Sequence, residues 1–288
     1  MITAEQQTQL KTYIKNLKPS VAGKFFYYCL PFRKKVVLQN MQNVLGNFLF
    51  PEEIKKLAQG FYSHIATSLK ENIFLRFMSI KKIRAKAEIL GEEYLRALEN
   101  NEIKGAIIIT GHFGNWEFAP IAGILNYPQF YNRFFFVRKL IANKSIEKIL
   151  FKRYYQAGLN VIPKKNSLEK VCDALETHNA VVFVMDQHAS IKARDGVMVD
   201  FFGRPAGTFK SPAIIAKHMQ VPVLPARSYR KKDGKHVLEF LPIIPWQNHH
   251  DEKEEIKLNL RAYNQALENL ILEYPDQWLW MHKRWKTS

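Results

Sequence analysis

The amino-acid sequence predicts an α/β fold: a single domain whose largely parallel, mixed central sheet is flanked by helices. Short apolar runs alternate along the chain with segments of helical periodicity, which is the pattern of βαβ units. The chain has 288 residues, of which 47% are hydrophobic and 24% charged, so it can bury a sizeable core. No repeat, low-complexity tract or linker divides this core. We expect a basic N-terminal region over 1–35, rich in helix, and one domain over 36–288.

The helices are recognised by apolar residues at helical spacing and by their first residues. Pro51 suits the first turn of a helix, and Ser167 opens a pattern resembling a capping box. In the first long helix the spaced residues are Ile54, Leu57, Phe61, Ile65, Leu69 and Ile73. In chain order we expect helices over 51–78, within 81–99, over 145–157 and 167–177, from 211, and over 256–274.

The strands are recognised by short runs of apolar residues, many of them β-branched or aromatic. We expect them at 105–109, 134–137, 160–162, 180–185, 221–229 and 236–241. The sequence Lys-Asp-Gly-Lys at 232–235 predicts a hairpin turn between the last two. The glycine- and phenylalanine-rich stretch 199–208 is compatible with a loop lining an apolar pocket or with a turn packed on the core.

The formal net charge of +17 predicts an anionic partner, which is nucleic acid, an anionic membrane or an acidic substrate. No helix-turn-helix, zinc or RNA-binding signature is found, so nucleic acid is not expected. Two cysteines, Cys29 and Cys172, are too few for a disulfide framework and lack metal-ligand spacing. We therefore expect a reducing compartment and no metal.

Both ends of the chain mix basic and aromatic residues. Residues 1–35 hold seven basic residues against the single acidic Glu5, and this composition predicts a segment lying on an anionic membrane surface. The alternative is a solvated basic helix that packs its aromatic residues on the domain. The three tryptophans in 277–286 predict a second membrane contact. No secretory signal or bilayer-spanning run is evident, so we expect a peripheral protein.

The strongest candidate for catalysis follows the strand at 105–109. His112 comes directly after Thr110 and Gly111, and Glu117 lies five residues further on. A histidine at the carboxyl end of a strand can accept a hydroxyl proton, and a carboxylate within reach can fix its tautomer and stabilise the imidazolium. The alternative is a polar loop whose histidine caps a helix.

Two further strand ends carry polar residues. Arg138 ends the strand at 134–137, while Asp186 and Gln187 follow the strand at 180–185. If these strands are neighbours, their ends converge with His112 on one cleft. Arg138 and Arg153 are candidates for binding phosphate or carboxylate through forked hydrogen bonds.

The order of these segments supports a family assignment. The run Gly-His-Phe-Gly-Asn-Trp-Glu at 111–117 closely resembles the histidine-four-residues-acid motif of the bacterial late acyltransferases of lipid A biosynthesis, within the broader glycerolipid acyltransferase superfamily. Four further segments follow in the family's order, at 153–158, 184–187, 201–208 and 278–285. The hydrophobic membrane-anchoring helix usual at the start of such proteins is here short and interrupted by lysines.

The resemblance implies transfer of a fatty acyl chain from a thioester of acyl carrier protein or coenzyme A to a hydroxyl of a glycolipid, most simply a lipid A precursor of lipopolysaccharide. It implies His112 as base with Glu117 assisting, and gives importance to Arg153 and Asp186. The candidate substrate-binding residues are Asn115, Arg138, Arg153, Asp186 and Gln187. No cofactor is expected, and the expected location is the cytoplasmic face of the bacterial inner membrane.

Three alternatives stay open. The first is an acyltransferase whose acceptor is another membrane lipid, since relatives use the same motif on other lipids. The second is a thioesterase or lipase, in which the same dyad activates water in place of an acceptor hydroxyl. The most distant alternative is a non-catalytic basic protein that binds membranes or nucleic acid.

Overall fold

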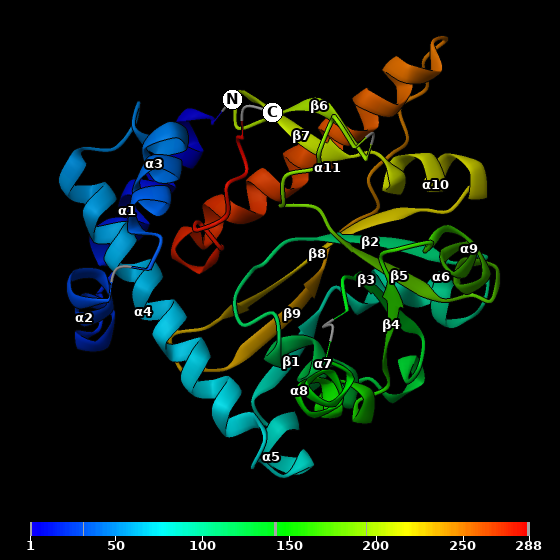
Figure 1. The fold of residues 1–288 in the computed structure, drawn as a ribbon, viewed down its shortest axis with the longest axis horizontal. Coiled ribbons are helices and arrows are strands. Elements are labelled where there is room, and N and C mark those ends of the chain that lie inside the picture. Colours follow the sequence, from blue (N-terminus) through cyan, green and yellow to red (C-terminus); the bar gives the residue numbers. More distant parts are fainter. Residues whose placement is uncertain (1, 31, 141–142, 194, 287–288) are drawn as a thin grey trace.

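The computed structural model describes residues 2–30, 32–140, 143–193 and 195–286. Its centre is a seven-stranded sheet in the order β1-β9-β8-β2-β5-β3-β4 (Figure 1). The strands are β1 (Ala87–Leu90), β2 (Ala106–Thr110), β3 (Phe134–Arg138), β4 (Leu159–Pro163), β5 (Ala180–Val184), β8 (Val223–Arg230) and β9 (His236–Phe240). Their pairings are parallel except in the β8–β9 hairpin. This confirms the predicted fold class.

Helices cover both faces of the sheet because successive strand residues point to opposite sides. On one face Ile108 packs with residues of α7 (Phe118–Asn126) and α8 (Lys144–Gln156). On the other face Ile107 and Ile109 pack with residues of three helices. These helices are α9 (Leu168–Glu176), α10 (Ser211–Met219) and α11 (Glu252–Glu273).

The chain before the sheet is helical and packs onto the domain. Its helices are α1 (Ala4–Asn16), α2 (Val21–Cys29), α3 (Lys34–Leu45), α4 (Pro51–Leu75), α5 (Ile80–Arg84) and, after β1, α6 (Arg96–Glu99). Leu10, Ile14 and Tyr27 are buried in the same core as α11. In contrast, Phe25 and Phe32 are exposed. Some aromatic residues of 1–35 therefore pack on the domain, while others face outward.

Two regions differ from the sequence-based expectation. Strand β1 was not expected within 81–99. The stretch expected as a loop or turn forms part of an antiparallel hairpin of β6 (Gly196–Phe201) and β7 (Arg204–Phe209). Its two-residue turn places Phe202 and Gly203 at φ of 57° and 72°. Glycine at the second position adopts this backbone without strain. Three short 3₁₀ helices, η1 (Glu92–Leu95), η2 (Pro128–Phe130) and η3 (Pro275–Gln277), complete the elements.

The membrane contact expected of the C-terminal tryptophans is wrong for two of the three. Trp278 and Trp280 are fully buried in the core, and Trp285 is partly buried against it. Separately, within the described residues no helix combines the length and the apolar character needed to cross a bilayer.

Candidate active site

The loop between β2 and α7 carries His112 at the carboxyl edge of the sheet. Strand β5 pairs directly with β2 and β3 pairs with β5, so the three polar strand ends are adjacent, as predicted. Gly114 turns the loop at φ of 54°, and a Cβ there would lie 2.6 Å from the carbonyl oxygen of Ser228. Only glycine fits this close approach.

The imidazole of His112 is held by Asp186 and not by Glu117. Its Nδ1 lies 2.9 Å from Oδ1 of Asp186, while the backbone N–H of His112 donates to Oδ2 at 2.7 Å. The indole N–H of Trp278 donates to the same Oδ2 at 2.9 Å. The contact differs from the sequence-based interpretation, in which Glu117 was the carboxylate expected to hold the imidazole. With Nδ1 engaged by a carboxylate, Nε2 is the ring atom left to exchange a proton.

The electrostatics of this pair favour a charged imidazole. Burial alone lowers the pKa of His112, but the charge and hydrogen bond of Asp186 outweigh it, and the net shift is upward. For Asp186, burial raises the pKa, while His112 and Trp278 hold it at about 2. Asp186 therefore stays ionised at neutral pH.

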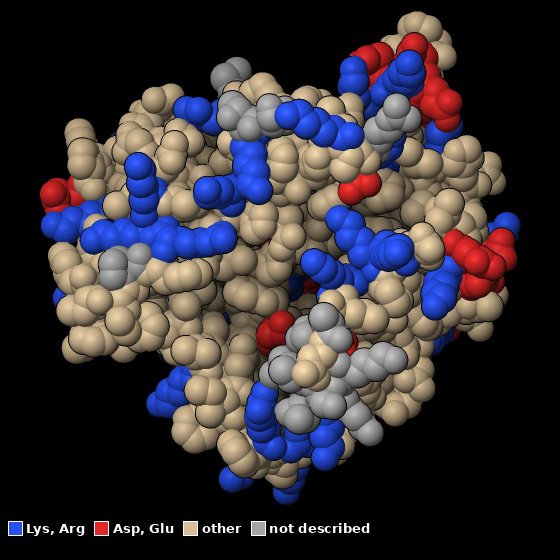
Figure 2. Space-filling model, in the orientation of Figure 1, with Lys and Arg blue, Asp and Glu red and all other residues tan. Residues whose placement is uncertain are grey.

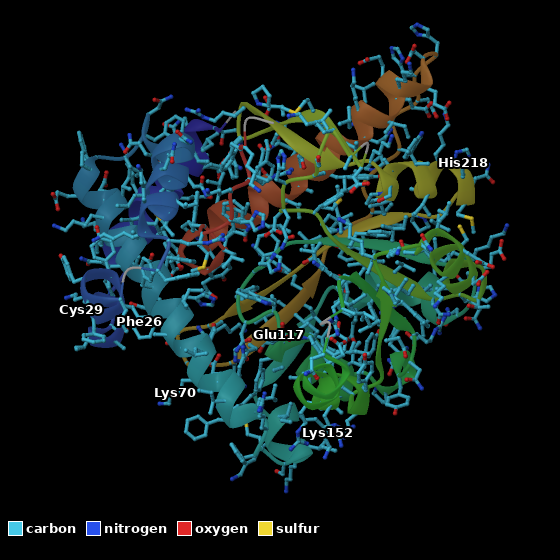
Figure 3. The ribbon with its side chains drawn as sticks, viewed as in Figure 1. Phe26, Cys29, Lys70, Glu117, Lys152 and His218 are labelled. Atoms are coloured by element: carbon cyan, nitrogen blue, oxygen red, sulfur yellow. The ribbon has the colours of Figure 1, made fainter. Side chains whose placement is uncertain are left out.

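Glu117 lies just before α7, near the centre of the view in Figure 3. Burial raises the pKa of its carboxyl, and the charges of Arg138 and His112 oppose this shift. Glu117 lines the same cavity as His112. It therefore acts on the imidazole through its charge, while Asp186 acts through contact.

An apolar cavity of about 190 Å³ opens beside His112. Its wall is one face of the sheet, because alternate residues of neighbouring strands line it, such as Phe134, Phe136 and Arg138 of β3. Helices α7 and α8 cover it through side chains that include Ile124, Phe151 and Tyr154. Since both ends of β3 contribute, the cavity runs along a strand for about 13 Å. Its polar end is at His112 and its far end is hydrocarbon.

The remaining predicted residues lie around this centre in different ways. The side-chain nitrogen of Gln187 is 3.4 Å from Nε2 of His112. Arg138 lines the cavity, pairs with Glu147 and stacks over Phe151. Its Nε is buried without a hydrogen-bond partner in the part of the chain that the structure describes.

Arg153 and Asn115 do not reach the imidazole by a hydrogen bond that the structure shows. The guanidinium of Arg153 donates to the backbone carbonyls of Arg76 and Met78 at 3.0 Å each, which ties α8 to the end of α4. The amide oxygen of Asn115 accepts from the N–H of Phe118 at 3.1 Å and so caps α7.

A buried polar cluster that we did not predict contacts the loop that carries His112, through Asn115 and Gly114. The side-chain N–H of Asn115 donates to Glu71 at 2.9 Å, and Glu71 is paired with Arg230 of β8. His64 contacts the carbonyl of Gly114 at 3.0 Å. Burial and the neighbouring Arg230 lower the pKa of His64 to about 3, so this imidazole is neutral. His64, Ser68 and Glu71 lie on one face of α4, but this helix carries other polar residues as well, so the sequence alone did not single them out.

The C-terminal tail, residues 278–285, packs against the loop that carries His112. Its backbone pairs with the loop that carries His112, because Leu279 N–H donates to the His112 carbonyl at 3.1 Å and Trp278 forms an isolated β-bridge with Phe113. Arg284, fully buried, donates to the carbonyls of Gln187 and Gly207. It thereby joins the strand end after β5 to the β6–β7 hairpin.

Comparison with known protein families assigns the chain to a family. The family model for bacterial lipid A biosynthesis acyltransferases matches residues 15–287. The chain belongs to this family. A phosphatidylinositol mannoside acyltransferase of Mycolicibacterium smegmatis is 22% identical over 194 residues, which cover 63% of this chain and 57% of that protein. The match thus spans little more than half the length of this relative. His112 and Glu117 lie in the run at 111–117 on which the predicted resemblance rested.

Proposed function

We propose that the protein transfers a fatty acyl chain from a thioester of acyl carrier protein or coenzyme A to a hydroxyl of a glycolipid, most simply a lipid A precursor. One observation carries this proposal: the His112–Asp186 pair stands at the polar end of an apolar cavity. A base at the mouth of a hydrocarbon pocket is the arrangement that acyl transfer needs.

In the proposed reaction Nε2 of His112 removes the proton of the acceptor hydroxyl as its oxygen attacks the thioester carbonyl carbon. A C–O bond forms and gives a tetrahedral intermediate. The C–S bond then breaks, and the imidazolium returns its proton to the thiolate of the carrier. Asp186 keeps the second ring proton on Nδ1, and the charge of Glu117 further stabilises the imidazolium. The scheme uses these side chains and needs no cofactor.

The surrounding residues are assigned to substrate placement. The cavity between the sheet and α7–α8 takes the acyl chain, so its far end at Phe134 bears on chain length. Arg138, whose Nε points to no protein partner among the described residues, suits a phosphate or carboxylate of the acceptor. Gln187 orients the group at Nε2. Arg153 acts through the position of α8, and Asn115 through that of the loop.

Two features bear on the acceptor and the location. The net charge of +17 suits both an acidic carrier protein and phosphorylated lipids at the cytoplasmic face of the inner membrane. The name of the mycobacterial relative points to a glycolipid acceptor of another class. A membrane lipid other than a lipid A precursor is therefore the second candidate acceptor.

The decisive experiment compares His112→Ala and Glu117→Gln with the wild type, using acyl carrier protein thioester and a glycolipid acceptor. The expected loss is about a hundredfold or more for His112→Ala, since general-base catalysis contributes at least that much. The matched control is His218→Ala, because His218 is exposed on α10, far from Glu117 in Figure 3.

Each alternative function has its own outcome. Free fatty acid in place of acylated lipid would identify a thioesterase or lipase. Unchanged activity in a folded His112→Ala variant would show that His112 is not the general base. Mass spectrometry of lipids from cells with and without the gene would identify the acceptor.

A further inference from the structure

An exposed apolar strip runs along the second half of α4 and beyond it. The first half of this helix is buried as expected, with Ile54, Leu57 and Phe61 in the core. Leu69 and Ile73, at the same helical spacing, are more than half exposed instead, and Phe77 just past the helix is 82% exposed. Side chains four residues apart share a helix face, so these residues form a line. Large apolar groups gathered in this way mark an interaction surface.

The strip continues onto the N-terminal region. Tyr62 stands on the same face of α4, eleven residues before Ile73, or about 16 Å along the helix. Its hydroxyl donates to the carbonyl of Phe32 at 2.7 Å. Phe32 is 67% exposed, and Tyr28, joined to α4 through Gln59, is also exposed. The outward-facing aromatic residues near α2 and the α4 line are therefore parts of one surface.

We call this surface the α2–α4 strip and define it by its exposed apolar members: Phe25, Tyr28, Leu30, Phe32, Leu69, Ile73, Phe74, Phe77 and Ile80.

The residues between and after the strip's members are strongly basic. Segment 18–35 contains five basic residues and no acidic one, and segment 62–86 contains six basic residues against Glu71 alone. Glu71 is turned inward and paired with Arg230. Lys70, Lys81 and Lys82 are exposed. Where Figure 1 places α2 and α4, Figure 2 shows lysine and arginine side chains among a larger area of uncharged residues.

The helix that carries most of the strip contacts the candidate active site through its inward face and its end. Glu71 bonds Asn115 in the catalytic loop, and Arg153 ties the end of α4 to α8, which covers the cavity. At the other end, Arg33 donates to the carbonyl of Met281 in the tail. A surface in contact with the strip would therefore lie next to the cavity.

We propose that the α2–α4 strip docks the enzyme on an anionic lipid bilayer, with its aromatic and aliphatic side chains in the interface and its lysines on the headgroups. The proposal rests on the proposed function in that the acceptor is a membrane lipid. A second copy of the chain is a poorer occupant, since two such strips would bring like charges together. A bilayer offers both the apolar layer and the negative charge that the strip matches.

The test is binding of the full chain to vesicles of phosphatidylcholine with and without phosphatidylglycerol. The double variant Ile73→Ser with Phe77→Ser removes apolar surface from the strip. We expect it to lower affinity for anionic vesicles about tenfold or more, because each large apolar side chain contributes to insertion. Its matched control is Leu168→Ser with Leu258→Ser, two exposed leucines outside the strip.

A charge variant supplies the second readout. Lys81→Gln with Lys82→Gln should weaken binding about fivefold for each lysine removed at low salt. This difference should shrink in high salt, where exposed charges are screened. The apolar variant should keep its defect there. Both variants should retain wild-type turnover on detergent-dispersed substrates and show a raised KM on vesicles.

The outcomes separate docking from catalysis. His112→Ala should bind vesicles like the wild type, so docking is measured even if the reaction proves to be another one. Wild-type vesicle affinity in the strip variant, with the fold confirmed by melting, would overturn the proposal. A change in molecular mass by light scattering with vesicle binding intact would also overturn it and assign the strip to a second copy.

Discussion

The N-terminal region and the C-terminal tail have similar compositions, but their aromatic side chains differ in burial. Both mix lysine and arginine with aromatic residues, and both suggested contact with a membrane. In the N-terminal region Phe25 and Phe32 face outward, whereas Trp278 and Trp280 at the other end are fully buried. The difference in burial arises from the parts of the structure against which each segment packs. The tail pairs with the catalytic loop over the strand ends, while α2 packs only one face against α4. Composition alone therefore does not distinguish a surface segment from part of an active site.

The largest effect that this comparison predicts is at Arg284. Its guanidinium is fully buried and donates to two carbonyls and to Thr208. Arg284→Met would leave these acceptors without donors, and we expect a loss of about 3 kcal/mol or more of stability. The exposed neighbour Lys283 is the matched control, and Lys283→Met should stay within about 0.5 kcal/mol in urea unfolding. Equal effects would show that the tail is not built into the core.

The next largest effect is at Asp186, whose carboxylate accepts a hydrogen bond from Trp278 of the tail. Asp186→Asn removes the charge that raises the pKa of His112, and we expect activity to fall about a hundredfold. The base works only when neutral, so wild-type kcat/KM should rise with pH through a His112 pKa above 6.5 and then level off. In Asp186→Asn this rise should move to lower pH. A rise left in place would show that Asp186 does not set the protonation of His112.

A smaller effect is expected where the tail meets Asp186. Trp278→Phe keeps an aromatic ring but removes the N–H that donates to Oδ2. We expect a loss of about 1.5–3 kcal/mol in stability, the usual range for a hydrogen bond to a charged group. The pKa of Asp186 should rise, since Trp278 is among the groups that lower it. Titration of the carboxyl by NMR measures this shift, and an unchanged pKa would contradict the contact.

The smallest effect belongs to the N-terminal region. Phe25→Ser and Phe32→Ser change exposed side chains, so each should alter the free energy of unfolding by no more than about 0.5 kcal/mol. Tyr27→Ser, a buried neighbour, should be clearly destabilising. If the exposed pair proved as costly as Tyr27, the contrast between the two ends of the chain would disappear.

The sheet was predictable because its strands are short apolar runs that end abruptly in polar residues. His112, Arg138 and Asp186 were found for the same reason, and the adjacency of their strands brings their ends to one edge. The partner of His112 was not predictable, because Asp186 lies 74 residues away and reaches Nδ1 only through the pairing of β2 with β5. Glu117 was chosen for its nearness in sequence.

Other features depend on burial, which the sequence does not encode locally. His64 and Glu71 belong to a helix whose polar residues are compatible with a solvated face, but they meet Arg230 from a distant strand. Leu69 and Ile73 continue an apolar periodicity that elsewhere means core, and nothing in their spacing shows that the core ends before them.

The pairing of the tail with the catalytic loop has a consequence for the order of events during synthesis. The ribosome makes the strands and His112 long before Trp278 and Leu279, which complete the setting of Asp186 and of the loop. A nascent chain that has folded its sheet still lacks these contacts. The geometry at Nδ1 of His112 therefore becomes complete only when the last segment docks, and a polypeptide terminated before Trp278 has an unfinished active site.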